Sequence, residues 1–169
     1  MQSTGRKSTD PLCFGSRDVA YGALTITKTR FVKTMKLVHK SGSIYCNTFN
    51  GGSYCGCHNP TYICYVNSDL MIIITNANRV ALLPPSEDIV ANGHPVSPMK
   101  HVYSVEGTGH LSPELVFRNL SSPLSLLRNQ ELRIWHSQDW VIVEKSGAVC
   151  VDVYAWYIQS ITPVERYKD

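Results

Sequence analysis

The residues best suited to chemistry in this 169-residue sequence are its six cysteines, four of which crowd into nineteen positions. These four are Cys46, Cys55, Cys57 and Cys64, with His58 beside them. At such density, thiolates and an imidazole are zinc ligands in a reducing compartment and disulfide partners in an oxidising one. Structural zinc sites usually pair their ligands as Cys-x2-Cys, whereas the close pair here is Cys55-x-Cys57. The spacing therefore favours disulfides, and neither a metal nor any other cofactor is expected.

All six cysteines are disulfide candidates under this interpretation. Cys13 and Cys150 are expected to join the first strand of the domain to the last. Cys46 and Cys64 would each bond one member of the close pair, which staples the intervening loop to its flanking strands. Six cysteines leave many connectivities open, so this pairing is one hypothesis among several.

Histidines, serines and carboxylates form no recognisable catalytic motif. His94, His101 and His110 share one short span, but they lack the spacing that places two rings on one ion. A G-x-S-x-G nucleophile motif is absent, and Gly51-Gly52 is not followed by the lysine and helix of a phosphate-binding loop. The protein is therefore expected not to be an enzyme.

Aromatic side chains beside polar loop residues are the candidate ligand contacts. A ring can cover the apolar C–H face of a sugar while neighbouring amides and carboxylates bind its hydroxyls. Tyr54 with Asn59, and Trp140 with Asp139, have this composition, and they are the predicted ligand-binding residues. Trp135 lies in an alternating segment and is expected in the core.

Short segments of alternating polarity must position these residues. The clearest is the last, where Val149, Val151, Val153 and Ala155 share one face of an expected strand. The segment 31–39 is also extended in character, with a turn expected at 41–43. The continuously apolar segment 70–75 is typical of a strand covered on both faces.

Two further segments complete the pattern. Residues 84–100 hold four prolines and read as a long connection without regular structure. In 122–136, Ser122-Pro123 resembles a helix start, yet Leu132 and Ile134 alternate with Arg133. A strand, a turn and a second strand are favoured there over a helix.

Composition restricts the class of protein. The net charge of +3 carries no concentrated basic patch, which excludes nucleic acid as an expected partner. No apolar run approaches the ~18 residues that a membrane span needs. The polar N-terminus has no signal-peptide core. It is consistent either with a methionine added to a mature secreted chain or with a cytosolic protein.

Many short strands without a βαβ rhythm predict an all-β fold, a single antiparallel β-sandwich or jelly roll with long loops and little helix. The expected boundaries are a flexible tail over 1–11, the sandwich over 12–162 and a C-terminal tail over 163–169.

Four stretches together resemble a poorly characterised group of secreted, cysteine-containing β domains of marine invertebrates; they are 35–43, 111–117, 130–135 and 149–154. The resemblance implies a β-sandwich and an extracellular location. In that group the motif around Trp135 tends to be followed by an acidic segment that could hold a cation. Here that segment carries only Asp139 and Glu144, so no metal site is carried over.

The leading hypothesis is a non-enzymatic extracellular recognition domain that binds a glycan or a protein surface through loops 47–60 and 84–100, because binding residues collect on loops held by a rigid scaffold. The alternative is a structural or assembly protein, such as a matrix component or capsid-like jelly roll, acting through contacts between identical subunits. A small hydrolase comes third.

Overall fold

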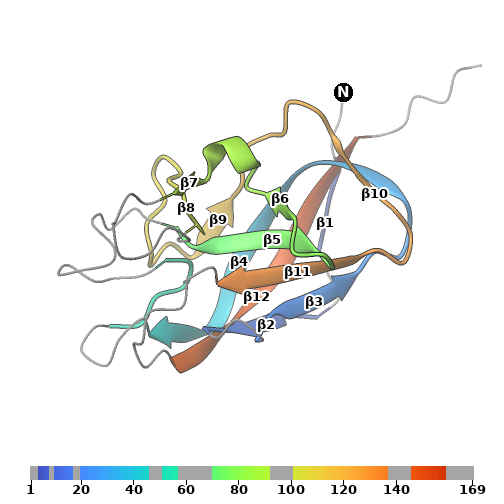
Figure 1. Ribbon diagram of the computed structural model, residues 1–169. Helices are drawn as coiled ribbons and strands as arrows, with labels where there is room; N and C mark the ends of the chain where they lie inside the picture. The colour runs from blue at the N-terminus through green and yellow to red at the C-terminus, as the bar shows by residue number, and fades with distance from the viewer. Residues whose placement is uncertain are drawn as a thin grey trace, which may run out of the picture.

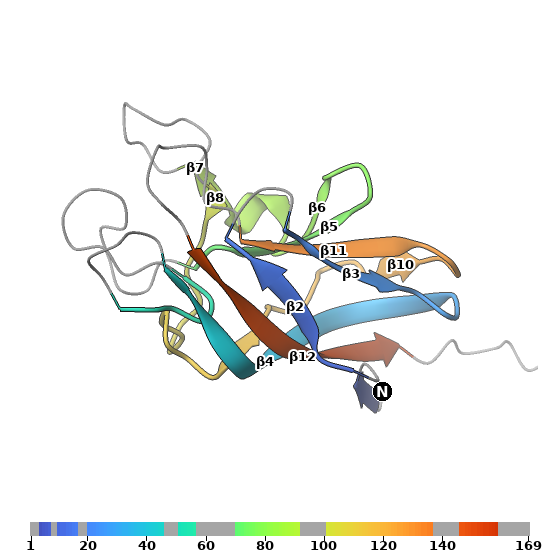
Figure 2. The same ribbon diagram turned by 90° about the horizontal axis from the view of Figure 1, so that it is seen from below.

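Two antiparallel sheets pack face to face in the computed structural model (Figures 1 and 2). The structure describes residues 4–7, 10–16, 20–45, 51–56, 70–91, 101–136 and 146–158. Figure 2 shows the two layers from the side, with β4 and β12 in one and β3 and β11 in the other. This arrangement is the predicted all-β sandwich. No helix within the described ranges is long and apolar enough to cross a membrane.

The larger sheet has the order β1-β12-β4-β10, with β2 also paired to β12 and β9 to β4. Its strands are β1 (Thr4–Lys7), β2 (Leu12–Gly15), β4 (Arg30–Tyr45), β9 (Glu114–Val116), β10 (Leu124–Leu126) and β12 (Ser146–Ile158). The long central strands β4 and β12 pair antiparallel along almost their whole lengths. Every other strand of this sheet pairs with one of these two.

The smaller sheet has the order β3-β11-β5-β6 and lies in front of β4 and β12 in Figure 1. Its strands are β3 (Gly22–Thr25), β5 (Ile72–Asn76), β6 (Ala81–Leu83) and β11 (Glu131–His136). A separate two-stranded ladder joins β7 (Val90–Ala91) to β8 (His101–Val102), and a 3-10 turn, η1 (Ser86–Asp88), precedes β7.

The core fills the space between the sheets, and alternation decides which side chains reach it. Val149, Val151, Val153 and Ala155 of β12 are all buried, as their spacing predicts. Residues 70–75, which include all of β5 except its last residue, are buried, and this agrees with the expected central strand. On β11, Leu132, Ile134 and His136 are buried while the residues between them are half exposed.

The turn expected at residues 41–43 is wrong, because β4 continues through it as a single strand. A register shift opposite Cys150 and Val151 leaves Lys40 without a paired position on β12, and Gly42 adopts φ +79°. A Cβ added to Gly42 would lie 2.1 Å from the Ala148 carbonyl oxygen. The glycine therefore permits a close backbone approach two positions beyond the bulge at Lys40, and the chain does not reverse there.

The strand, turn and strand expected over 122–136 are confirmed as β10, a turn with Asn129 at φ 67°, and β11. The two strands belong to different sheets, so this connection crosses from one layer to the other. The expected unstructured connection over 84–100 is wrong in its first part, which contains η1 and β7; residues 92–100 lie outside the described ranges. Within the expected flexible tail, β1 pairs with β12.

A disulfide joins Cys13 to Cys150, as expected. Cys55 was a further disulfide candidate, and this prediction is wrong because Cys55 is a buried free thiol. Its sulfur lies 3.2 Å from the Gly109 carbonyl oxygen, which accepts the hydrogen bond that a bridged sulfur could not donate. Cys46, Cys57 and Cys64 lie outside the described residues.

Candidate functional site

A contact between two distant segments marks the end of the sandwich where β11 stops. His136, the last residue of β11, has its Nε2 atom 3.2 Å from the carbonyl oxygen of Gly56, 80 positions earlier in the sequence. Both residues are buried. The contact fits a hydrogen bond donated by the imidazole, and it anchors the chain segment before residue 57 to the end of the smaller sheet.

Tyr54 is the only predicted ligand-binding residue that the structure describes, and it packs on the larger sheet. Its ring stacks on the imidazole of His39 with centroids 3.7 Å apart and planes inclined by 16°. The His39 Nε2 atom lies 2.8 Å from the Gly42 carbonyl oxygen. The backbone N–H of Tyr54 donates to the His110 carbonyl oxygen at 2.8 Å. The half-buried tyrosine is thus held by its ring and by its backbone.

The neighbouring thiol is unsuited to nucleophilic chemistry. Burial raises the pKa of Cys55 to about 12, although a backbone hydrogen bond from Ser112 acts in the opposite direction. Burial also raises the pKa of Tyr103 well above its ordinary value, and the charge of a Cys55 thiolate would raise it further. Both groups are therefore protonated at neutral pH, whereas a catalytic cysteine reacts as the thiolate.

The expectation that Trp135 lies in the core is wrong. It is half buried on the outer face of the smaller sheet, because Leu132 and Ile134 take the inward positions of β11. Tyr21 packs against its ring with centroids 4.7 Å apart, and the Arg79 guanidinium lies 5.1 Å from the ring centroid. Trp135 Nε1 donates to Thr75 Oγ1 at 2.8 Å.

This outer group, formed by Tyr21, Arg79, Arg133 and Trp135, is an array of alternating aromatic rings and guanidinium groups. Arg133 stands over the Tyr21 ring at 4.5 Å and pairs with Glu131 at 2.5 Å. Such cation–π contacts hold the rings in fixed orientations. The sequence signal for this array was the alternation of β11. Once Leu132 and Ile134 are assigned to the inward face, Arg133 and Trp135 must face outward.

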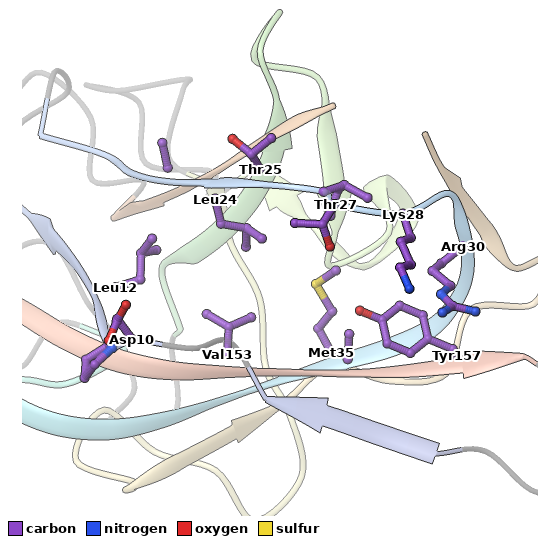
Figure 3. A pocket seen from close by; sticks show the side chains of 14 residues that line it. Asp10, Leu12, Leu24, Thr25, Thr27, Lys28, Arg30, Met35, Val153 and Tyr157 are labelled. Atoms are coloured by element: carbon purple, nitrogen blue, oxygen red, sulfur yellow. The ribbon is translucent and has the colours of Figure 1, made fainter. Parts of the chain in front are cut away.

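A cavity of about 560 Å³ opens between the two sheets beside β3 (Figure 3). Its apolar wall comes from both layers and consists of Leu12, Leu24, Ile26, Met35, Val153 and Ala155. Lys28, Arg30 and Tyr157 lie at one end of the cavity and Asp10 at the other. No sequence pattern predicted this cavity, since it exists only where residues from β2, β3, β4 and β12 meet.

The remaining predicted site residues, Asn59, Asp139 and Trp140, lie outside the described residues. Their neighbours in the sequence do not: Asn59 follows Gly56 by three positions, and Asp139 follows His136 by three. Among the residues that the structure does describe, no group of three or more histidines, cysteines or carboxylates is placed to hold a metal ion.

Searches against protein-family models and against curated proteins found no match. A search of solved structures found AJLec from the sea anemone Anthopleura japonica, with a TM-score of 0.76 and 26% sequence identity. The similarity covers 89% of this chain and 94% of AJLec. The sandwich fold and the resemblance to cysteine-containing β domains of marine invertebrates, both expected from the sequence, are therefore confirmed by a protein that matches almost end to end.

Proposed function

We propose that this protein is a non-enzymatic, extracellular carbohydrate-binding protein. The observation that carries the proposal is the likeness to AJLec, whose name designates a lectin, over nearly the full length of both chains. The Cys13–Cys150 disulfide supports an oxidising location, because such bonds persist mainly outside the reducing cytosol. Glycans are the proposed partners.

The proposed sugar site lies at the end of the sandwich marked by the contact between Gly56 and His136. This contact supports the grouping of the predicted residues because it fixes two segments that lead directly to them. Three residues span at most ~11 Å. Asn59 can therefore lie no farther than this from Gly56, and Asp139 no farther than this from His136. Tyr54 precedes Gly56 by only two positions.

Each proposed residue has a chemical role in this site. The rings of Tyr54 and Trp140 would cover the apolar C–H face of a sugar, while Asn59 and Asp139 would bind its hydroxyls. The stacking of Tyr54 on His39 supports its role, since a ring that is already oriented loses little conformational freedom on binding.

A glycan array probed with the labelled full chain tests the proposal. We expect a restricted set of glycans to be bound, with inhibition by the corresponding free sugar. Trp140→Ala and Asp139→Asn should each weaken binding at least about tenfold, the loss expected for a central contact. Leu127→Ala is the control, because Leu127 is 59% exposed and lies in the connection before Glu131, at the opposite end of β11 from His136.

All variants are compared only if their melting temperatures and the Cys13–Cys150 bond match those of the parent chain. Absence of saturable binding to any glycan would refute the function. Binding that survives both substitutions would refute the site while leaving the function standing. Sedimentation over a range of concentrations tests the assembly alternative, which requires a mass that rises with concentration.

A further inference from the structure

The inter-sheet cavity has the composition of a ligand site that sugar binding does not use. The hydroxyls of Thr25 and Thr27 belong to its lining, but most of the wall between the charged ends is aliphatic. Such a wall suits an apolar chain better than a sugar, whose hydroxyls would lose most of the hydrogen bonds they make with water. The buried part of the wall includes Ile26, Met35 and Val153, which are 8%, 2% and 5% exposed. The volume of about 560 Å³ falls within the range of roughly 300–1,000 Å³ that is typical of small-molecule sites.

Charge is distributed unevenly along this cavity. Lys28 and Arg30 lie together at one end of the cavity (Figure 3). The Tyr157 ring lies beside them, on the side of β12. The Arg30 guanidinium lies 5.7 Å from the centroid of that ring. No ion pair of Lys28 or Arg30 with a carboxylate is seen in the described part of the chain. This end therefore presents two cations and a phenolic hydroxyl to an incoming group.

The opposite end carries the Asp10 carboxylate beside Leu12 (Figure 3). An anionic group is repelled at that end and attracted at the other, so the charges orient an elongated ligand. Leu12, Leu24 and Val153 lie along the path between the two ends. An aliphatic chain would replace water against these side chains.

We propose that this cavity binds a free, single-chain fatty carboxylate, with its head group at Lys28 and Arg30 and its chain directed toward Leu12. The carboxylate accepts hydrogen bonds from the Lys28 ammonium, the Arg30 guanidinium and the Tyr157 hydroxyl. The chain lies between the two sheets. The site is separate from the proposed sugar site, because no residue of the cavity wall belongs to the end marked by Gly56 and His136.

Titration calorimetry of the full chain with sodium dodecanoate, kept below its micelle concentration, tests the proposal. We expect saturable binding of one molecule per chain. Octanoate, decanoate and dodecanoate should form a series in which each added CH₂ strengthens binding about threefold to fourfold, the value for transfer of a methylene from water. Dodecyltrimethylammonium, which has the same chain and a cationic head, should bind far more weakly.

Two sets of variants separate the charge from the cavity. Lys28→Gln with Arg30→Gln should weaken dodecanoate at least about tenfold, the usual effect of losing hydrogen bonds to a charged group. These substitutions should leave binding of neutral dodecanol unchanged. Lys33→Gln with Arg128→Gln removes the same charge from exposed positions outside the cavity and should change neither ligand. Leu24→Trp fills the cavity and should weaken both ligands.

Three results would overturn the proposal. They are absence of saturable dodecanoate binding, equal affinity for the cationic amphiphile, and binding to phosphatidylcholine vesicles without binding of the free carboxylate. The chain-length series uses the unaltered protein, so it decides the matter even if Leu24→Trp fails to fold.

Discussion

Cys13 of β2 and Cys150 of β12 are bonded to each other across 137 positions of sequence, at directly paired positions of neighbouring strands. Nearly the whole domain lies between them. A link of this length removes many conformations from the unfolded chain and little from the folded one.

The double variant Cys13→Ser with Cys150→Ser is therefore expected to lower the free energy of unfolding by about 2–5 kcal/mol, the range for loss of a native disulfide. Urea unfolding followed by tryptophan fluorescence measures this difference. A change below about 1 kcal/mol would show that the bond contributes little to stability.

Gly42→Ala should destabilise the protein more than Gly107→Ala. Both glycines have positive φ, +79° and +74°, so an alanine at either position carries a backbone cost of about 1–2 kcal/mol. Only at Gly42 does the new Cβ collide, 2.1 Å from the Ala148 carbonyl oxygen, whereas at Gly107 it meets nothing within 4 Å. The difference between the two melting temperatures isolates the steric part. Equal losses would contradict the close approach of β4 and β12.

Tyr103→Phe should cost about 1 kcal/mol in the free energy of unfolding. The Tyr103 hydroxyl donates to the Ile72 carbonyl oxygen at 2.6 Å, and the residue is 2% exposed. Tyr45→Phe is the matched control, since Tyr45 is 42% exposed and its hydroxyl exchanges readily with water. Denaturant unfolding of both variants measures the two losses. The comparison requires that the dependence of the free energy of unfolding on denaturant concentration is the same in both.

Cys55 should resist alkylation in the native protein at pH 8 and react fully after unfolding. With the pKa raised to about 12, only about one thiol in 10⁴ is ionised at that pH. Peptide mapping after iodoacetamide treatment identifies the labelled position. Rapid native labelling of Cys55 would contradict its burial.

The same shift predicts a dependence of stability on pH. The folded state retains the Cys55 proton above pH 9, where the unfolded chain begins to lose it, so folding binds a proton in this range. The contribution is complete below pH 9 and is lost as the pH rises toward 12. Cys55→Ala should flatten this part of the stability profile.

Local patterns predicted the strands well because burial on one face imposes a strict period of two. Val149, Val151 and Val153 follow that period, and they form the buried face of β12. Turn signals were less reliable. Gly42 between two serines is typical of a reversal, but its positive φ occurs here inside a continuous strand, where the backbone of β12 approaches closely. Only the partner strand distinguishes these two outcomes.

The candidate sites depended more heavily on contacts between distant residues. Trp135 was expected in the core because it belongs to an expected strand, yet it points outward because its neighbour Ile134 takes an inward position of β11. Cys55 was expected in a disulfide because other cysteines are near in sequence, but its hydrogen bond to Gly109 depends on a loop fifty-four positions away. The cavity unites Leu12 with Tyr157, which no local pattern connects.

The pairing of β12 along one side has a consequence for solubility. Its Ala148–Val151 part is covered by β2 and its Tyr154–Tyr157 part by β1, so two short N-terminal strands together occupy that margin. An unpaired strand edge of this length would offer a row of free N–H and C=O groups to another chain, which is the usual starting point for intermolecular sheet growth. β1 and β2 thus protect this edge of β12 from pairing with another chain, and the Cys13–Cys150 disulfide holds β2 in place.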